Sequence, residues 1–162
     1  MKKTPIQNVA LGGMLAALVW LFTFAVQIPI PATGGYVNGG DGIILLSGML
    51  LGPFAWLPTG IGAALADLLS GYTLYVAPTF LIKGLMGFAA GRFARRGRPM
   101  FNACLFVAVE AIMVGGYFVF EGFALGWAAA LTGVGMNAVQ GAAGVAIGSA
   151  LCTAFKNMPG QG

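Results

Sequence analysis

Long apolar runs, separated by short polar or Pro/Gly-rich segments, set the pattern of this chain. A membrane helix needs about 20 mostly apolar residues, whereas a barrel strand alternates apolar and polar positions over about 10 residues. Because these runs are nearly continuous, helices are the expected spanning element. We therefore predict six transmembrane helices, at about residues 9–26, 42–56, 58–69, 78–93, 100–120 and 125–155.

Composition supports an integral membrane protein. Of the 162 residues, 59% are apolar and only 7% are charged, against roughly 25% charged in a soluble domain. We expect one all-α membrane domain over residues 1–162. The chain has no histidine, which argues against most zinc sites and against histidine-based catalysis. No nucleotide-binding, hydrolase or metal-ligand motif is found, so we expect no enzyme activity, metal or bound cofactor.

The positive charges predict an orientation. Lys2, Lys3 and Lys156 lie near the two termini, and four arginines fall within residues 92–98. Cytoplasmic segments carry an excess of Lys and Arg. Six helices with both ends in the cytoplasm place all of these residues inside and leave the outer loops (residues 27–40, 71–77 and 121–124) without Lys or Arg. Glu121-Gly122 is expected to turn the chain in the last of these loops.

The segment 27–40 is rich in Pro and Gly, including Pro29, Pro31, Gly34 and Gly35. Pro fixes φ and Gly permits positive φ, so we expect a shaped loop. Asp41 follows at the position of an N-cap for the second helix. The loop would lie over the outer end of that helix.

Ionisable groups inside apolar sequence are costly and often functional. Asp67 and Lys83 flank an outer turn centred near Tyr75, each eight residues from it, so they should lie at similar depth and form a salt bridge. Such a pair could pin two helices together or belong to a substrate site. Glu110 lies near the middle of the fifth helix without a sequence-adjacent partner.

Asn137 and Gln140 are three residues apart and present amides on one face of the last helix. Amides both donate and accept, which suits a heterocyclic ligand, although they also hold membrane helices together. Tyr36 and Tyr75 could stack on a flat ligand or belong to an interfacial aromatic belt. In the first helix, small residues recur every four positions, a spacing that lets another helix approach or serves ordinary packing: Gly12 with Ala16, and Gly13 with Ala17.

Several segments resemble the S components of energy-coupling factor (ECF) vitamin transporters, in particular the riboflavin-type branch. They are GYVNGGD at 35–41, LGP at 51–53, AALADLLSGY at 63–72, APTFLIKG at 77–84 and NAVQ at 137–140. The likeness is strong over about residues 35–91 and looser, in length and helix layout, elsewhere.

The resemblance implies a substrate-binding subunit in the plasma membrane of a bacterium or archaeon. Such a subunit captures a vitamin or precursor outside, then docks on a membrane coupling subunit driven by two cytoplasmic ATPases, so that only the partners use ATP. Segment 27–40 would be its lid, and Gly12, Gly13, Ala16 and Ala17 its docking face. Riboflavin, a B6 vitamer, a thiamine precursor and a cobalamin-like ligand all remain open. The candidate substrate-binding residues are Tyr36, Asn38, Asp41, Asp67, Tyr75, Lys83, Glu110, Asn137 and Gln140.

Two other functions stay open at this point. A self-sufficient ion-coupled carrier or channel could use Asp67, Lys83 and Glu110 as a proton path. A structural protein without a ligand would leave the shaped Pro/Gly segment unexplained.

Overall fold

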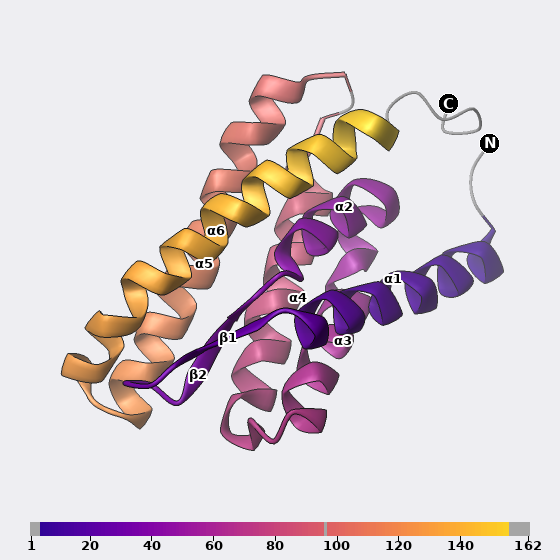
Figure 1. The fold of residues 1–162 in the computed structure, drawn as a ribbon. Helices are drawn as coiled ribbons and strands as arrows, with labels where there is room; N and C mark the ends of the chain where they lie inside the picture. Colours follow the sequence, from indigo (N-terminus) through magenta and orange to yellow (C-terminus); the bar gives the residue numbers. More distant parts are fainter. Residues whose placement is uncertain (1–3, 96, 156–162) are drawn as a thin grey trace.

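The computed structural model of the chain describes residues 4–95 and 97–155. These residues form a bundle of α-helices with a small β-hairpin between the first two (Figure 1). The elements in order are α1 (Pro5–Ala25), β1 (Gln27–Ile30), β2 (Gly35–Asn38), α2 (Asp41–Leu51), the 3₁₀ turn η1 (Gly52–Ala55), α3 (Trp56–Leu69), the 3₁₀ turn η2 (Thr73–Tyr75), α4 (Val76–Phe93), α5 (Pro99–Ala124) and α6 (Trp127–Phe155).

The described part of the chain contains five segments long and apolar enough to cross a membrane, which makes this a multi-pass membrane protein. The prediction was six. Asp41–Leu69 counts as one such segment, because α2 and α3 are individually short and η1 joins them. Figure 1 nevertheless shows α2 and α3 running in different directions, with their junction at the same end of the bundle as the α4–α5 connection. Six separate crossings therefore stay a prediction.

The break between α2 and α3 has the expected local cause. Gly52 caps α2 with a φ of +62°, a conformation that favours glycine, and Pro53 is the second residue of the 3₁₀ turn. The start of α1 is fixed by a reciprocal capping box between Thr4 and Gln7. Helix α5, by contrast, continues past the predicted end to Ala124. Glu121 therefore lies in its last turn rather than in a loop, and the sequence prediction was wrong there.

Residues 27–40 do not form an irregular loop. Gln27–Ile30 and Gly35–Asn38 pair antiparallel, with Gln27 opposite Asn38 and Ile30 opposite Gly35. Ile30, Gly35 and Val37 are buried, and Tyr36 and Asn38 are half-buried, so the hairpin packs on the bundle mainly through β2. Burial of Ile30 and Val37 explains part of the aliphatic content of a segment that also carries Pro and Gly.

Small residues set the spacing between the helices of the bundle. A Cβ at Gly62 of α3 would collide with the Ala16 carbonyl of α1, and one at Gly91 of α4 would collide with Gly52. Such close approach of backbones is typical of membrane bundles. The buried apolar cluster comes mainly from α2, α4 and α5 and includes Leu45, Met86 and Phe106.

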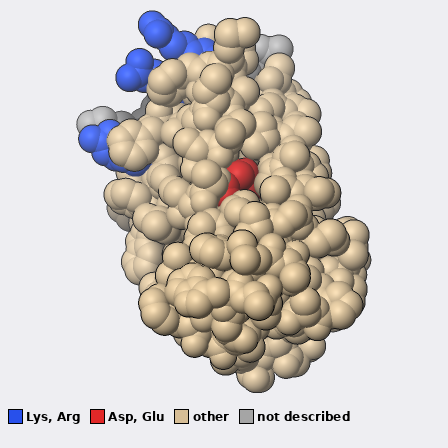
Figure 2. Space-filling model, turned by 90° about the vertical axis from the view of Figure 1, so that its left-hand side faces the viewer, with Lys and Arg blue, Asp and Glu red and all other residues tan. Residues whose placement is uncertain are grey.

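Positive charge is confined to one end of the surface that Figure 2 shows. Lys and Arg gather at its upper end, and a small acidic area is seen at the bottom of a hollow in an otherwise uncharged face. Arg92, Arg95 and Arg98 at the α4–α5 connection are exposed. They are the described members of the positive groups that were predicted to lie in the cytoplasm. Lys2, Lys3, Arg96 and Lys156 lie outside the described residues. The sidedness in a membrane stays a prediction.

Candidate functional site

A small polar cavity lies beneath the hairpin. Its volume is about 20 Å³, close to that of a single water site. The lining comes from both strands, α3, η2, α4, α5 and α6: Ile30, Gly35, Tyr36, Asn38, Asp67, Tyr75, Thr79, Tyr117, Glu121 and Asn137. Sites for drug-sized ligands measure roughly 300–1,000 Å³. A vitamin would therefore fit only if the hairpin or the neighbouring helices moved outward.

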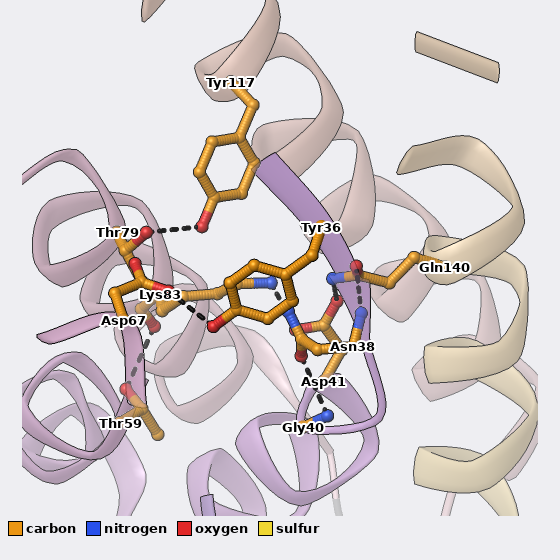
Figure 3. Close-up of polar contacts among 10 residues, drawn as sticks. All are labelled: Tyr36, Asn38, Gly40, Asp41, Thr59, Asp67, Thr79, Lys83, Tyr117 and Gln140. Atoms are coloured by element: carbon orange, nitrogen blue, oxygen red, sulfur yellow. Dashed lines mark hydrogen bonds and ion pairs between the residues drawn. The ribbon is translucent and has the colours of Figure 1, made fainter. Parts of the chain in front are cut away.

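Asp41 is the centre of the polar network next to this cavity (Figure 3). Lys83 of α4 forms an ion pair with its Oδ1, and Gln140 of α6 donates from Nε2 to its Oδ2 at 2.5 Å. Asp41 is the first residue of α2 and does not cap it; Gly40 is the N-cap residue. The predicted partner of Lys83 was Asp67, and that prediction was wrong. The side chains of Asp41 and Lys83 are each 1% exposed, so both charges are compensated inside the bundle.

Gln140 also holds the hairpin. Its Oε1 accepts a hydrogen bond from the backbone N–H of Asn38 at 2.8 Å, and the Asn38 side chain accepts from the N–H of Gly40 at 3.0 Å. Both ends of the Gln140 amide are thus used within the protein. One residue of α6 therefore joins the end of β2 to the Asp41–Lys83 ion pair.

Asp67 is bound by the hairpin rather than by α4. The Tyr36 hydroxyl of β2 donates to its Oδ1 at 2.5 Å, and Figure 3 shows the Tyr36 ring reaching across the site toward α3. The other oxygen, Oδ2, is buried and has no hydrogen-bond partner among the described residues. Burial, together with the negative charge of Asp67, raises the pKa of Tyr36 above its ordinary value. Tyr36 therefore remains a hydrogen-bond donor at any physiological pH.

A second tyrosine–carboxylate pair lies at the hairpin tip. Tyr75 donates to the Thr33 carbonyl at 2.8 Å and is 3.2 Å from Oε1 of Glu121. Oε2 of Glu121 is buried and has no partner in the described structure. Glu121 was not among the predicted site residues, because the following Gly122 indicated a turn. Glu121 could have been identified from its rarity, because the chain has only four acidic residues.

Two further side chains line the cavity wall. The hydroxyls of Thr79 and Tyr117 are 2.9 Å apart, and the ammonium of Lys83 lies 5.7 Å from the Tyr117 ring centroid. Asn137 lies one turn from Gln140 and is 4% exposed. Tyr36, Asn38, Asp67, Tyr75 and Asn137 are thus the predicted residues that line the cavity.

Glu110 lies beside Asp41 but does not line the cavity. Both of its carboxylate oxygens are buried without a hydrogen-bond partner in the described structure. The carboxylate lies against the backbone of α6 at Gly144, where an added Cβ would meet both Glu110 and Asp41. Asp41, Lys83 and Gln140 likewise lie next to the cavity rather than on its surface.

A second and larger cavity, about 390 Å³, lies at the end of the bundle that carries the exposed arginines. Its lining includes Met49, Asn102, Phe106 and Cys152, and none of the predicted substrate-binding residues. Its size alone would make it the better ligand site. The convergence of buried polar groups, however, is found beneath the hairpin, and such groups give a ligand site its specificity.

The four small residues of α1 divide into two faces. Gly12 is buried near Phe54 and Pro58, and the Ala16 carbonyl lies against Gly62 of α3. Gly13 and Ala17 are exposed, and no atom lies within 4 Å of the position a Cβ would take at Gly13. Internal packing therefore uses the Gly12–Ala16 face.

This chain is similar in sequence to one protein family and to two further proteins. The family model for the S component of ECF-type riboflavin transporters matches residues 3–157. An uncharacterised protein of Pyrococcus woesei is 35% identical over 136 residues, which is 82% of this chain and 90% of that protein. The thiamine precursor transporter HmpT of Lactococcus lactis is 31% identical over 126 residues, 74% of this chain and 68% of HmpT.

Proposed function

The chain belongs to the family of ECF-type riboflavin transporter S components, and from this premise we propose that it captures a vitamin or vitamin precursor outside the cell and passes it inward. Its location would be the plasma membrane of a bacterium or archaeon. The relatives support transport of a vitamin-like compound but differ in what they are named for: riboflavin for the family and a thiamine precursor for HmpT. The substrate therefore has to be argued from the site.

The observation that carries the proposal is the cavity beneath the hairpin. Tyrosines, carboxylates and an amide converge there from segments far apart in the sequence, and pockets with a few convergent polar groups are the usual form of small-molecule sites. The hairpin supplies one wall through Tyr36 and Asn38. Opening it would expose the cavity, and closing it over a substrate would exclude water.

The hairpin would act as the lid through a small number of contacts. Asn38 is held by Gln140, Tyr36 by Asp67, and the carbonyl of Thr33 by Tyr75. Each is a hydrogen bond, with a typical net contribution of about 0.5–1.5 kcal/mol, or about 1.5–3 where one partner is charged. A few such bonds can be exchanged for contacts to a substrate without unfolding the helices.

Energy for transport would come from partners. We propose that a membrane coupling subunit and two cytoplasmic ATPases bind this chain, and that ATP is used only by them. The exposed Gly13 and Ala17 on α1 offer a small-residue face for that coupling subunit. The chain itself would need no bound cofactor.

The direct test is to identify what the purified chain binds. We expect mass spectrometry of the purified protein to find one small heterocycle, and calorimetry to show that Asn137→Ala weakens its binding at least tenfold, because the Asn137 amide lines the cavity. Thr132→Val, on the exposed side of α6, is the matched control and should bind like the unmodified chain.

Uptake assays separate this function from an ion-coupled carrier. Liposomes containing the whole assembly should accumulate the compound only with ATP, and liposomes with this chain alone should not. Uptake by the chain alone, driven by a proton gradient, would contradict the proposal and support the carrier.

A further inference from the structure

The larger cavity, at the arginine end of the bundle, changes in polarity from its inner wall to its rim. Its volume of about 390 Å³ falls within the usual range for ligand sites. The inner wall includes Leu46 of α2 and Phe106 of α5, which are 4% and 0% exposed. The rim is formed by exposed residues of the α4–α5 connection, among them Arg98. An apolar cavity therefore carries a positive charge at its rim.

This positive charge has no acidic partner in the chain. The four acidic side chains are at most 4% exposed inside the bundle, and none of them lines this cavity: Asp41, Asp67, Glu110 and Glu121. Lys83 forms the ion pair of the described residues, so the exposed arginines at this end have no carboxylate partner among them. An anion from outside the chain would supply the missing charge.

The polar atoms of the lining are few. The Asn102 side chain is occupied, because both of its amide atoms bond the backbone of Arg95. The hydroxyl of Ser149 on α6 is buried and has no partner among the described residues. Met49 and Cys152 add sulfur-containing, mainly apolar surface. Such a lining suits a long apolar group that carries few polar atoms, such as an ester carbonyl, which can accept from the Ser149 hydroxyl.

We propose that this cavity binds an anionic phospholipid of the surrounding bilayer, with one acyl chain among α2, α5 and α6 and the phosphate at Arg98. Basic pockets between membrane helices bind anionic head groups, and a guanidinium pairs well with phosphate oxygens. A phospholipid has its charge at one end and its apolar chains at the other, which matches the cavity from rim to inner wall. The chain's own segment 156–162, KNMPGQG, is a poorer match because it has a single large apolar residue.

The first experiment compares two lipids that share their acyl chains and differ in the charge of the head group. The purified full chain, stripped of lipid in detergent, is mixed with dioleoylphosphatidylglycerol or dioleoylphosphatidylcholine and examined by native mass spectrometry. The anionic lipid should be retained about fivefold more. Arg98→Gln should remove this preference. Arg92→Gln, which changes another exposed arginine at this end that does not line the cavity, is the matched control and should keep it.

The second experiment locates the acyl chain with the two natural cysteines. Cys152 lines the cavity, whereas Cys104 is exposed on α5 and does not line it. Phosphatidylglycerol should slow the reaction of Cys152 with a maleimide about fivefold and leave that of Cys104 unchanged, as measured by mass spectrometry of the peptides. In Arg98→Gln the same lipid concentration should no longer protect Cys152.

Three results would overturn the proposal. Equal retention of the two lipids by the unmodified chain would mean that the head-group charge is not recognised. Equal protection of Cys104 and Cys152 would mean that lipid coats the helices without entering the cavity. A reaction of Cys152 that is equally slow with and without lipid would mean that the chain itself covers the cavity.

Discussion

Lys83 holds together more of the polar network than its one ion pair suggests. It is paired with Asp41, and the Glu110 carboxylate lies beside Asp41 against Gly144 of α6. Carboxylates from α2 and α5 thus lie near one buried ammonium from α4. Removing the ammonium leaves both carboxylates without it, whereas removing Asp41 leaves Lys83 with Glu110 nearby.

This asymmetry gives a stability prediction. Lys83→Met should lower the free energy of unfolding by about 3–5 kcal/mol, the usual cost of breaking a buried pair. Asp41→Asn should cost less, because Lys83 retains neighbouring negative charge. The double variant should lose less than the sum of the single losses, as expected for residues in direct contact. Unfolding in detergent, followed by circular dichroism, measures all three.

Asn102, a buried amide at the arginine end of the bundle, serves as the comparison. Its side chain bonds the backbone of Arg95 through both amide atoms, so Asn102→Met should also destabilise the protein. Because it shares no contact with the ion pair, its loss should add independently to that of Lys83→Met. Additive losses in the Asp41–Lys83 double variant would show that the pair is not coupled, and the interpretation of this network would be wrong.

At this scale the sequence identified the costly groups but not their partners. Asp41, Asp67, Lys83 and Glu110 are conspicuous because ionisable residues are rare in apolar runs. Counting residues from the outer turn gives the depth of Asp67 and Lys83, but not the rotation of α3 and α4 about their axes. Tyr36 reaches Asp67 from 31 positions away in the sequence, and no local pattern predicts that contact.

Among the elements, the hairpin is tied to the helices by hydrogen bonds from side chains near both of its ends. Its outer end is held at the Thr33 carbonyl by Tyr75, and its inner end at the Asn38 amide by Gln140. Because Gln140 also donates to Asp41, movement of the hairpin and the position of the ion pair are physically linked.

Loss of the inner attachment should loosen the hairpin. Gln140→Leu keeps the approximate size of the side chain but removes its acceptor for the Asn38 N–H. We expect faster hydrogen exchange at the Asn38 amide and faster dissociation of the bound compound. Tyr75→Phe, which frees the Thr33 carbonyl instead, should act near the tip and leave Asn38 protected. Unchanged exchange at Asn38 in Gln140→Leu would contradict a lid held by this amide.

The sequence predicted the elements unevenly. The break at Gly52-Pro53 was clear, since both residues restrict the backbone. The hairpin was missed because Pro29, Pro31 and four glycines interrupt the segment, and its apolar residues Ile28, Ile30, Tyr36 and Val37 form only a weak strand pattern. The end of α5 was placed too early because Gly122 looked like a turn, although a helix in a packed bundle tolerates it.

For the whole molecule, the α4–α5 connection lies at the opposite end of the bundle from the turns that were predicted to face outward, and the side of the membrane that each end faces stays a prediction. Figure 1 shows the hairpin tip, the α3–α4 turn and the α5–α6 turn at one end of the bundle, opposite the α4–α5 connection. The candidate cavity lies beneath the hairpin, toward the end without exposed arginines. What the pattern could not predict is which face of α1 remains free, because that depends on how closely α3 approaches.

The free face of α1 leads to the last prediction, which concerns assembly. Gly13 and Ala17 are exposed and one turn apart, and a small-xxx-small face allows close approach of another helix. Gly13→Leu should therefore reduce recovery of the coupling subunit and ATPases with this chain at least tenfold, without changing ligand binding.

Gly135→Leu on α6 is the matched control, since Gly135 is also exposed with no atom within 4 Å of its Cβ position. Equal recovery with both variants would place the docking surface elsewhere; equal loss would mean that added bulk on any exposed helix prevents assembly, and that the Gly13–Ala17 face is not specific.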